Sequence, residues 1–278
     1  MLSALHLTAN TRAFGEAVGL LGRYRGLTWE MARREISSQY AGQLFGTLWA
    51  VGHPLFMLGL YLFIFGVVFR QRIGGTFELP LDYTTYIFAG LVPWLSFQQS
   101  MTRACTSLTG EANLVKQVVF PIEILPTKVV IASLVPQAVG LAVLIGYVLI
   151  QHGALHWTYV LLPALVTLQI LAMLGVAMAF AALSVFLRDL KDFVGLFATA
   201  GVYLMPVFYL PDWVPPVFKP VLHVNPFSYM VWCYQDALYF GRFAHPWAWV
   251  VFVIGSPLVF AVGYRLFRKL KPSFGNAL

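Results

Sequence analysis

The longest stretch without a charged residue runs from Val129 to Leu187, and it fixes the class of this protein. A helix that spans a membrane needs about 20 consecutive apolar residues, so this stretch is long enough for two such helices. Its one polar, turn-like break is 151–156, which predicts membrane spans at 125–150 and 157–186. The chain has 59% hydrophobic and 10% charged residues, whereas soluble domains carry about 25% charged residues. We therefore expect an integral membrane protein.

Other stretches without charge predict four more spans. They lie at 44–69, 83–102, 193–210 and 247–267. The predicted fold is all-α, with six transmembrane helices in a single membrane domain over 1–278. Between the last two spans, 211–245 is rich in proline and aromatic residues, and its apolar piece Pro226–Phe240 is too short to cross comfortably. We expect short re-entrant or surface-lying hairpin helices there, on the outer side of the membrane.

An amphipathic helix is predicted over 20–40, ahead of the first span. Its apolar residues recur at helical spacing, at Leu20, Tyr24, Leu27 and Met31. With many charged residues around this stripe, the helix is expected to lie in the membrane interface. Trp29 and Tyr40 are aromatic types that such helices place at headgroup depth. Arg33 and Arg34 suit either anionic headgroups or the pyrophosphate of a lipid carrier.

The distribution of Lys and Arg predicts the orientation. On this topology fourteen of the 18 basic residues lie on one side of the membrane and four on the other. Loops rich in Lys and Arg face the cytoplasm, so both chain ends are expected inside the cell. The formal net charge of +7 then reports orientation, and no nucleic-acid partner is expected. The beginning of the chain also lacks the pattern of a cleaved signal peptide.

The cytoplasmic stretch 111–126 mixes residues that are too polar for lipid with residues that are too apolar for a solvated loop. The polar set is Glu111, Asn113, Lys116 and Glu123, and the apolar set is Leu114, Val118, Val119 and Phe120. Pro121 and Pro126 are expected to end this element on its C-terminal side. It is either a short amphipathic element held against another protein or an ordinary loop at the membrane surface.

Motifs for chemistry are missing from the sequence. It has no glycine-rich phosphate loop, no zinc motif and no nucleophile elbow. His152 and His156 are four residues apart, but a polar turn accounts for them better than a metal site. No acid or base lies in the middle of a predicted span, which argues against an ion-coupled carrier and against a membrane-embedded enzyme. We therefore expect no catalytic residue, metal or cofactor in this chain, and a separate subunit that supplies energy.

Several stretches resemble the permease subunit of type-two ATP-binding-cassette exporters, particularly those that move lipid-linked polysaccharides such as O-antigen, teichoic acid or capsule. They are Arg34 with Tyr40, Leu44, Gly46, Leu48, Trp49 and Pro54, then Asn113–Lys116 with Phe120–Pro126, then Phe186–Leu190, Pro206–Tyr209 and Asn225–Phe227. The stretches follow the family's order. Ala41 stands where the family often has a basic residue, and Gln235 and Asp236 stand where it often has Arg.

The resemblance implies a homodimer in the bacterial inner membrane, paired with two cytoplasmic ATPase subunits that carry ATP and magnesium. The 111–126 element would seat in the ATPase and couple its closure to transport. The residues expected to carry this coupling are Glu111, Asn113, Leu114, Lys116, Phe120 and Pro121. The 20–40 helix would gate the cytoplasmic entrance, with Trp29, Arg33, Arg34 and Tyr40 as its principal residues.

The resemblance also implies a channel between two copies of the chain. Aromatic side chains could line it, because sugar rings stack on aromatic faces. The candidates are Tyr61, Phe65, Phe69, Tyr203 and Phe208, and the alternative is that they face lipid or pack between helices. The expected cargo is a lipid-linked polysaccharide. A related permease for a drug, a lipid or a small glycoconjugate is the alternative, and an integral glycan-modifying enzyme is a third hypothesis.

Overall fold

The computed structural model describes most of the chain, namely residues 15–16, 19–20, 22–39, 46–61, 63–64, 81–117 and 121–278. Within them every assigned element is a helix, as the sequence predicts. The first elements are α2 (Arg25–Gln39), η2 (Gly46–Leu48), α3 (Trp49–Tyr61), α4 (Tyr83–Ala104), η4 (Thr109–Glu111), α5 (Ala112–Gln117) and α6 (Ile124–His152). The later elements are η5 (Trp157–Leu161), α7 (Leu162–Ser184), α8 (Leu190–Gly201), η6 (Val202–Leu204), η7 (Pro211–Trp213), α9 (Lys219–Val224), α10 (Pro226–Gln235), η8 (Asp236–Phe240), α11 (Pro246–Leu270), η9 (Lys271–Ser273) and α12 (Phe274–Ala277).

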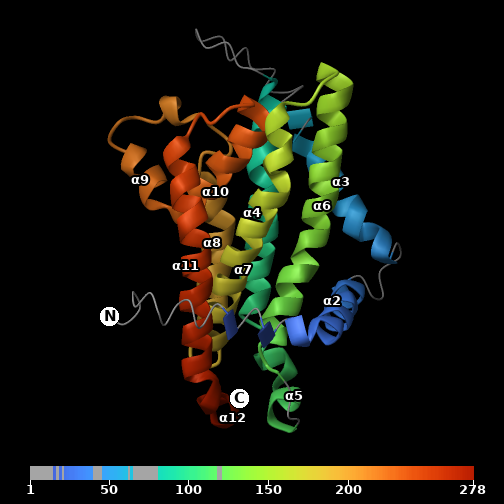
Figure 1. Cartoon of the computed structure of the whole chain (residues 1–278), viewed down its shortest axis with the longest axis vertical. Helices are drawn as coiled ribbons and strands as arrows, with labels where there is room; N and C mark the ends of the chain where they lie inside the picture. The colour runs from blue at the N-terminus through green and yellow to red at the C-terminus, as the bar shows by residue number, and fades with distance from the viewer. Residues whose placement is uncertain are drawn as a thin grey trace.

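The long helices α4, α6, α7 and α11 run side by side along the bundle (Figure 1). Three described stretches are long and apolar enough to cross a membrane, namely Ile124–His152, Trp157–Ser184 and Pro246–Ser273. They coincide with the third, fourth and sixth predicted spans. α4 matches the second span, and α3 covers part of the first. The count of six spans stays a prediction.

The fifth predicted span, 193–210, is too long. Its helix α8 ends at Gly201, η6 adds one short turn, and Met205 is already extended, with φ −125° and ψ 157°. Pro206 accounts for the break, because a proline disfavours the helical conformation of the residue before it. The ring also removes a backbone donor that a continuing helix would need.

Buried side chains from distant helices satisfy the backbone of this irregular segment. The Tyr86 hydroxyl donates to the carbonyl oxygens of Pro206, at 3.0 Å, and Tyr209, at 3.1 Å. Gln235 Nε2 donates to the same Pro206 oxygen at 2.7 Å. Such backbone is tolerated at membrane depth only where protein groups or water satisfy it. Tyr86 and Gln235 therefore hold the break in place.

The predicted hairpin region contains a buried helix. α10 and the π-helical turn η8 pack against α4, and α10 also packs against α7 and α11. This burial fits a re-entrant element and not one that lies on the surface. The carboxylate of Asp236, 1% exposed, accepts hydrogen bonds from His245 N, at 2.9 Å, and Trp249 Nε1, at 3.0 Å. Asp236 thereby fixes where α11 begins.

At the centre of the bundle, a buried polar cluster joins four helices. Gln137 of α6 and Gln169 of α7 exchange amide hydrogen bonds of 2.7 and 3.0 Å. The Tyr234 hydroxyl of α10 donates to Gln169 Oε1 at 2.6 Å, and Gln169 Nε2 reaches the Pro93 carbonyl of α4 at 3.0 Å. Because each amide has its partners, the cluster fixes the register of these helices without burying a charge.

Two glycines let α7 and α11 touch at backbone distance. A Cβ on Gly263 would lie 2.0 Å from the Gly175 carbonyl oxygen, and a Cβ on Gly175 would lie 2.4 Å from the Val259 carbonyl oxygen. Small residues at such crossings allow the close packing that holds membrane helices together. Replacing either glycine must push the two helices apart.

We expect Gly263→Ala to lower the unfolding free energy by about 1–3 kcal/mol, because the added methyl group has no room. Thermal unfolding of the purified chain in detergent measures the change. Gly255→Ala on the same helix is the matched control, since no described atom lies within 4 Å of a Cβ there. Equal melting temperatures for the two variants would contradict the close crossing.

The carboxylate of Asp82 joins the start of α4 to the end of α6. It accepts a hydrogen bond from Thr85 N at 3.1 Å, and it lies 3.1 Å from the Tyr147 hydroxyl and 3.0 Å from His152 Nε2. Burial by itself would raise the pKa of the Asp82 carboxyl. The hydrogen bonds with His152, Thr85 and Tyr147 outweigh that effect and hold the pKa below its ordinary value.

Folding lowers the pKa of Asp82, so the ionised carboxylate stabilises the fold at any pH above its pKa in the unfolded chain, about 3.9. This stabilisation is lost as the pH falls through the pKa in the folded chain. Asp82→Asn should therefore melt below the wild type at about pH 7, and the gap should narrow only below about pH 4. Melting curves of both proteins across this range provide the test. A gap that closes already at about pH 6 would contradict the lowered pKa.

Candidate functional site

One buried cation, Lys128, contacts two elements with predicted roles. One is α2, the predicted gate of the cytoplasmic entrance, and the other is the predicted coupling element at 111–126. Lys128, 6% exposed, lies in the first turns of α6. Its Nζ is 3.0 Å from Glu111 Oε1 in η4 and 3.1 Å from Glu35 Oε2 in α2. Arg103 of α4 lies 3.7 Å from the other Glu35 oxygen. A buried ammonium group needs such partners, so the two acids and Lys128 are held together.

The predicted coupling element contains the short helix α5, which lies at the same end of the bundle as α12 (Figure 1). Leu114 and Val115 pack on the core, whereas Asn113 and Lys116 are exposed. The described part of the element therefore has attached and exposed side chains, and whether it is held against another protein stays a prediction. Phe120 lies outside the described residues.

The role predicted for Pro126 is wrong. Pro121 begins the turn that follows the coupling element, but Pro126 lies within the first turn of α6. A proline is tolerated there because its missing N–H would have no partner in the helix. The neighbouring Glu123 is buried, and its Oε1 accepts a hydrogen bond of 2.7 Å from Lys271 Nζ. This contact attaches the start of α6 to η9.

The apolar stripe predicted for 20–40 lies only partly against the bundle, where Met31 is half-buried on the core. α2 packs on α6 through Thr28 and Ala32, which are buried, whereas Tyr24 and Leu27 of the stripe are exposed. Glu35 of the same helix lies beside Lys128 of α6. Trp29, the one aromatic residue within α2, is 60% exposed. Arg33 and Arg34 are also exposed, and Tyr40 lies outside the described residues.

Three of the predicted lining aromatics come together. The ring of Phe208 lies 5.8 Å from Tyr61 and 5.6 Å from Tyr203, measured between centroids. Tyr61 comes from α3, Tyr203 from η6 and Phe208 from the irregular segment after it. Tyr203 is 67% exposed. Phe65 and Phe69 lie outside the described residues. Whether these rings line a channel stays a prediction.

Sequence reasoning missed three residues that the structure makes prominent. The sequence indicates Lys128 only as one of the fourteen positive charges on the cytoplasmic side, and no motif marks Gln137 or Gln169. All three stand in or beside the long stretch without acidic residues, so each is a polar group that the apolar bundle must satisfy. A polar residue in or beside a long apolar stretch is therefore the sequence feature that would have indicated them.

Comparison with known proteins now identifies the family. Residues 26–239 match the ABC-2 type transporter family. The chain belongs to this family. The matched part runs from α2 through η8, so it contains the Glu35–Lys128–Glu111 contact, α5, the broken fifth helix and α10. Membership and the apolar helices together make it an integral protein of the inner membrane and a permease.

Relatives of this ABC-2 permease carry informative names. An O-antigen export system permease protein RfbA of Klebsiella pneumoniae is 27% identical over 260 residues, covering 93% of this chain and 97% of the relative. One of the same name from Myxococcus xanthus is 25% identical with the same coverage. The inner membrane transport permease YadH of Escherichia coli strain K12 is 26% identical over 191 residues, covering 64% of this chain and 71% of YadH.

Removing the Lys128 ammonium group should make local unfolding of the segment 109–117 easier. We expect Lys128→Met to speed backbone hydrogen exchange in 109–117 severalfold, because Glu111 loses its partner and local openings become easier. Mass spectrometry of peptides from the purified chain measures the exchange. Lys116→Met, a matched change at an exposed lysine on α5 itself, should leave the rate unchanged. Equal rates for both variants would show that Lys128 does not anchor this element.

Proposed function

We propose that this permease is the channel-forming subunit of an ATP-driven exporter that moves a lipid-linked polysaccharide across the bacterial inner membrane. The observation that carries the proposal is the match along 97% of relatives named O-antigen export permeases. YadH, whose name specifies no cargo, is matched over a smaller share of both chains. This difference in coverage favours a polysaccharide over a drug, a lipid or a small glycoconjugate.

Energy would come from a partner. The sequence holds no phosphate-binding loop, and membership of the ABC-2 family implies an ATP-binding-cassette subunit. Two such subunits, with ATP and magnesium, would dock on the exposed face of α5, where Asn113 and Lys116 are available. Phe120 and Pro121 would complete the contact, as the resemblance of this stretch implies.

The contact at Lys128 would transmit movement of the docked ATPase from α5 to α2. A displacement of α5 and η4 would move Glu111, and Lys128 would pass that movement to Glu35 on α2. α2 would then open or close the cytoplasmic entrance. Its exposed Trp29, Arg33 and Arg34 would face the headgroups or the phosphate of the arriving lipid carrier.

The channel would form between two copies of the permease. The neighbouring rings of Tyr61, Phe208 and Tyr203 would supply aromatic surface to it from each copy. Sugars pass over such a surface by stacking, without an ionic site that would hold them. Phe65 and Phe69 would extend the same lining.

The charge reversal Glu111→Lys tests the coupling role. It places a second cation beside Lys128, so the element should detach from α2 and export should fall at least about tenfold, while the partner still hydrolyses ATP. Surface polysaccharide in cells that lack the native copy, and ATP hydrolysis by the purified complex, are the two measurements. Lys269→Glu, a reversal at an exposed lysine near the end of α11, is the control.

Wild-type export by Glu111→Lys would remove the coupling claim. Failure of the unsubstituted chain and its ATPase to restore surface polysaccharide would remove the proposed cargo. Modification of a glycan by the purified chain alone, with no ATPase, would favour a membrane enzyme instead.

A further inference from the structure

α4 carries more polar residues than a membrane span requires. It has 22 residues and one basic residue, Arg103, yet it is not among the stretches apolar enough to cross by composition. Its second half contains Ser96, Gln98, Gln99 and Thr102, and the cost of burying such groups in lipid calls for a reason.

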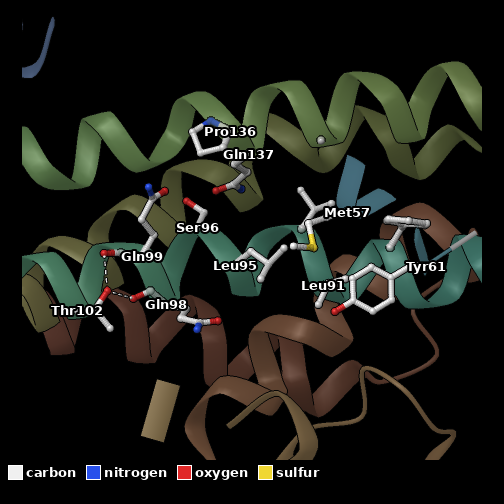
Figure 2. A pocket seen from close by; sticks show the side chains of 13 residues that line it. Met57, Tyr61, Leu91, Leu95, Ser96, Gln98, Gln99, Thr102, Pro136 and Gln137 are labelled. Carbon is white, nitrogen blue, oxygen red and sulfur yellow. Dashed lines mark hydrogen bonds between the residues drawn. The ribbon is translucent and has the colours of Figure 1, made fainter. Parts of the chain in front are cut away.

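These polar residues border a groove between α3, α4 and α6. The groove has a volume of about 300 Å³, which is at the lower end of the roughly 300–1,000 Å³ typical of pockets for small ligands. Figure 2 shows Ser96, Gln99 and Gln137 between α4 and α6, with Thr102 at one end and Tyr61 at the other. Met57 and Leu95 add apolar surface in between.

Two amides in the groove have unused hydrogen-bonding capacity. The Ser96 hydroxyl already donates to the Ser133 carbonyl at 2.8 Å, and Gln137 belongs to the central cluster. Within the described part of the chain, no hydrogen-bond partner is found for the side-chain amides of Gln98 and Gln99, which are half-buried. Each amide offers two donors and an acceptor oxygen.

The residues that line the groove indicate which class of ligand would bind there. None of the described residues that line it is charged, so an ionic ligand would find no counter-charge among them. A lipid tail would leave the Gln98 and Gln99 amides unpaired, which is unfavourable. A sugar satisfies both requirements, because its hydroxyl groups pair with amides and its C–H faces cover apolar and aromatic side chains such as Leu95 and Tyr61.

We infer that the groove between α3, α4 and α6 is a binding subsite for neutral sugar units, with Gln98 and Gln99 as its hydrogen-bonding groups. This inference rests on the proposed function and specifies one of the surfaces that the glycan touches inside a single copy of the permease. The uncharged lining binds hydroxyl groups that recur in every repeat of a polymer, so the subsite accepts successive units.

Photo-cross-linking in exporting cells tests the subsite directly. The photoreactive residue p-benzoylphenylalanine replaces Gln99 in one strain, and Ile254, 65% exposed on α11, in a control strain. Cells are fed a radiolabelled sugar that enters the polymer and are then irradiated. We expect the purified chain to carry sugar label from position 99 at least about tenfold above position 254.

Two results would overturn the inference while wild-type cells still export polymer. One is label at neither position, which would leave the groove filled only with water. The other is cross-linking at position 99 to a labelled fatty acid and not to sugar, which would make the groove a lipid site. Absence of export in wild-type cells would instead overturn the proposed function.

A substitution supplies a second readout. Gln98→Leu combined with Gln99→Leu should lower export about tenfold, because two hydrogen bonds to the sugar are lost. The melting temperature in detergent should stay unchanged, since the amides have no partner among the described residues. Gln98→Asn combined with Gln99→Asn keeps the amides and should retain more export. Unchanged export by the leucine variant would contradict the subsite.

Discussion

Hydrogen bonds between buried polar groups determine how the helices of this bundle pack. Gln137 and Gln169 pair with each other, and Gln169 also bonds to Tyr234, so α6, α7 and α10 can pack in only one register. The same requirement explains the fifth helix, whose break is kept because Gln235 and a buried tyrosine reach its carbonyl oxygens. An apolar interior would tolerate many packings, but an unpaired polar group in that interior would be costly.

The sequence was enough to predict what depends on local composition. Hydropathy placed the long helices within a few residues, whereas the mixed character of 111–126 left open whether it forms a short amphipathic element or an ordinary loop. Pro206 is a local sign that the fifth helix breaks, but the sequence could not show how the broken backbone is satisfied, because Tyr86 and Gln235 lie far away along the chain. Nor could it predict that Glu35 of α2 pairs with Lys128 of α6, because the two residues are far apart in the sequence.

The two kinds of polar contact suit different tasks. The amide cluster carries no charge and is fully buried, so it stabilises the middle of the permease as a rigid body. The Glu35–Lys128–Glu111 contact lies at the end of the bundle where the acids are partly exposed, so in the proposed coupling it would be the contact that rearranges. A rigid core beside an adjustable charged end is the arrangement expected of a subunit that receives its energy from outside.

The central claim is that this ABC-2 permease moves cargo only when a separate ATPase drives it through α5. The most direct measurement is transport of a radiolabelled lipid-linked polysaccharide into proteoliposomes that contain the purified chain, with and without its ATPase and ATP. We expect transport only when chain, ATPase and ATP are all present. Transport by the isolated chain, or transport that persists when ATP hydrolysis is blocked, would contradict it.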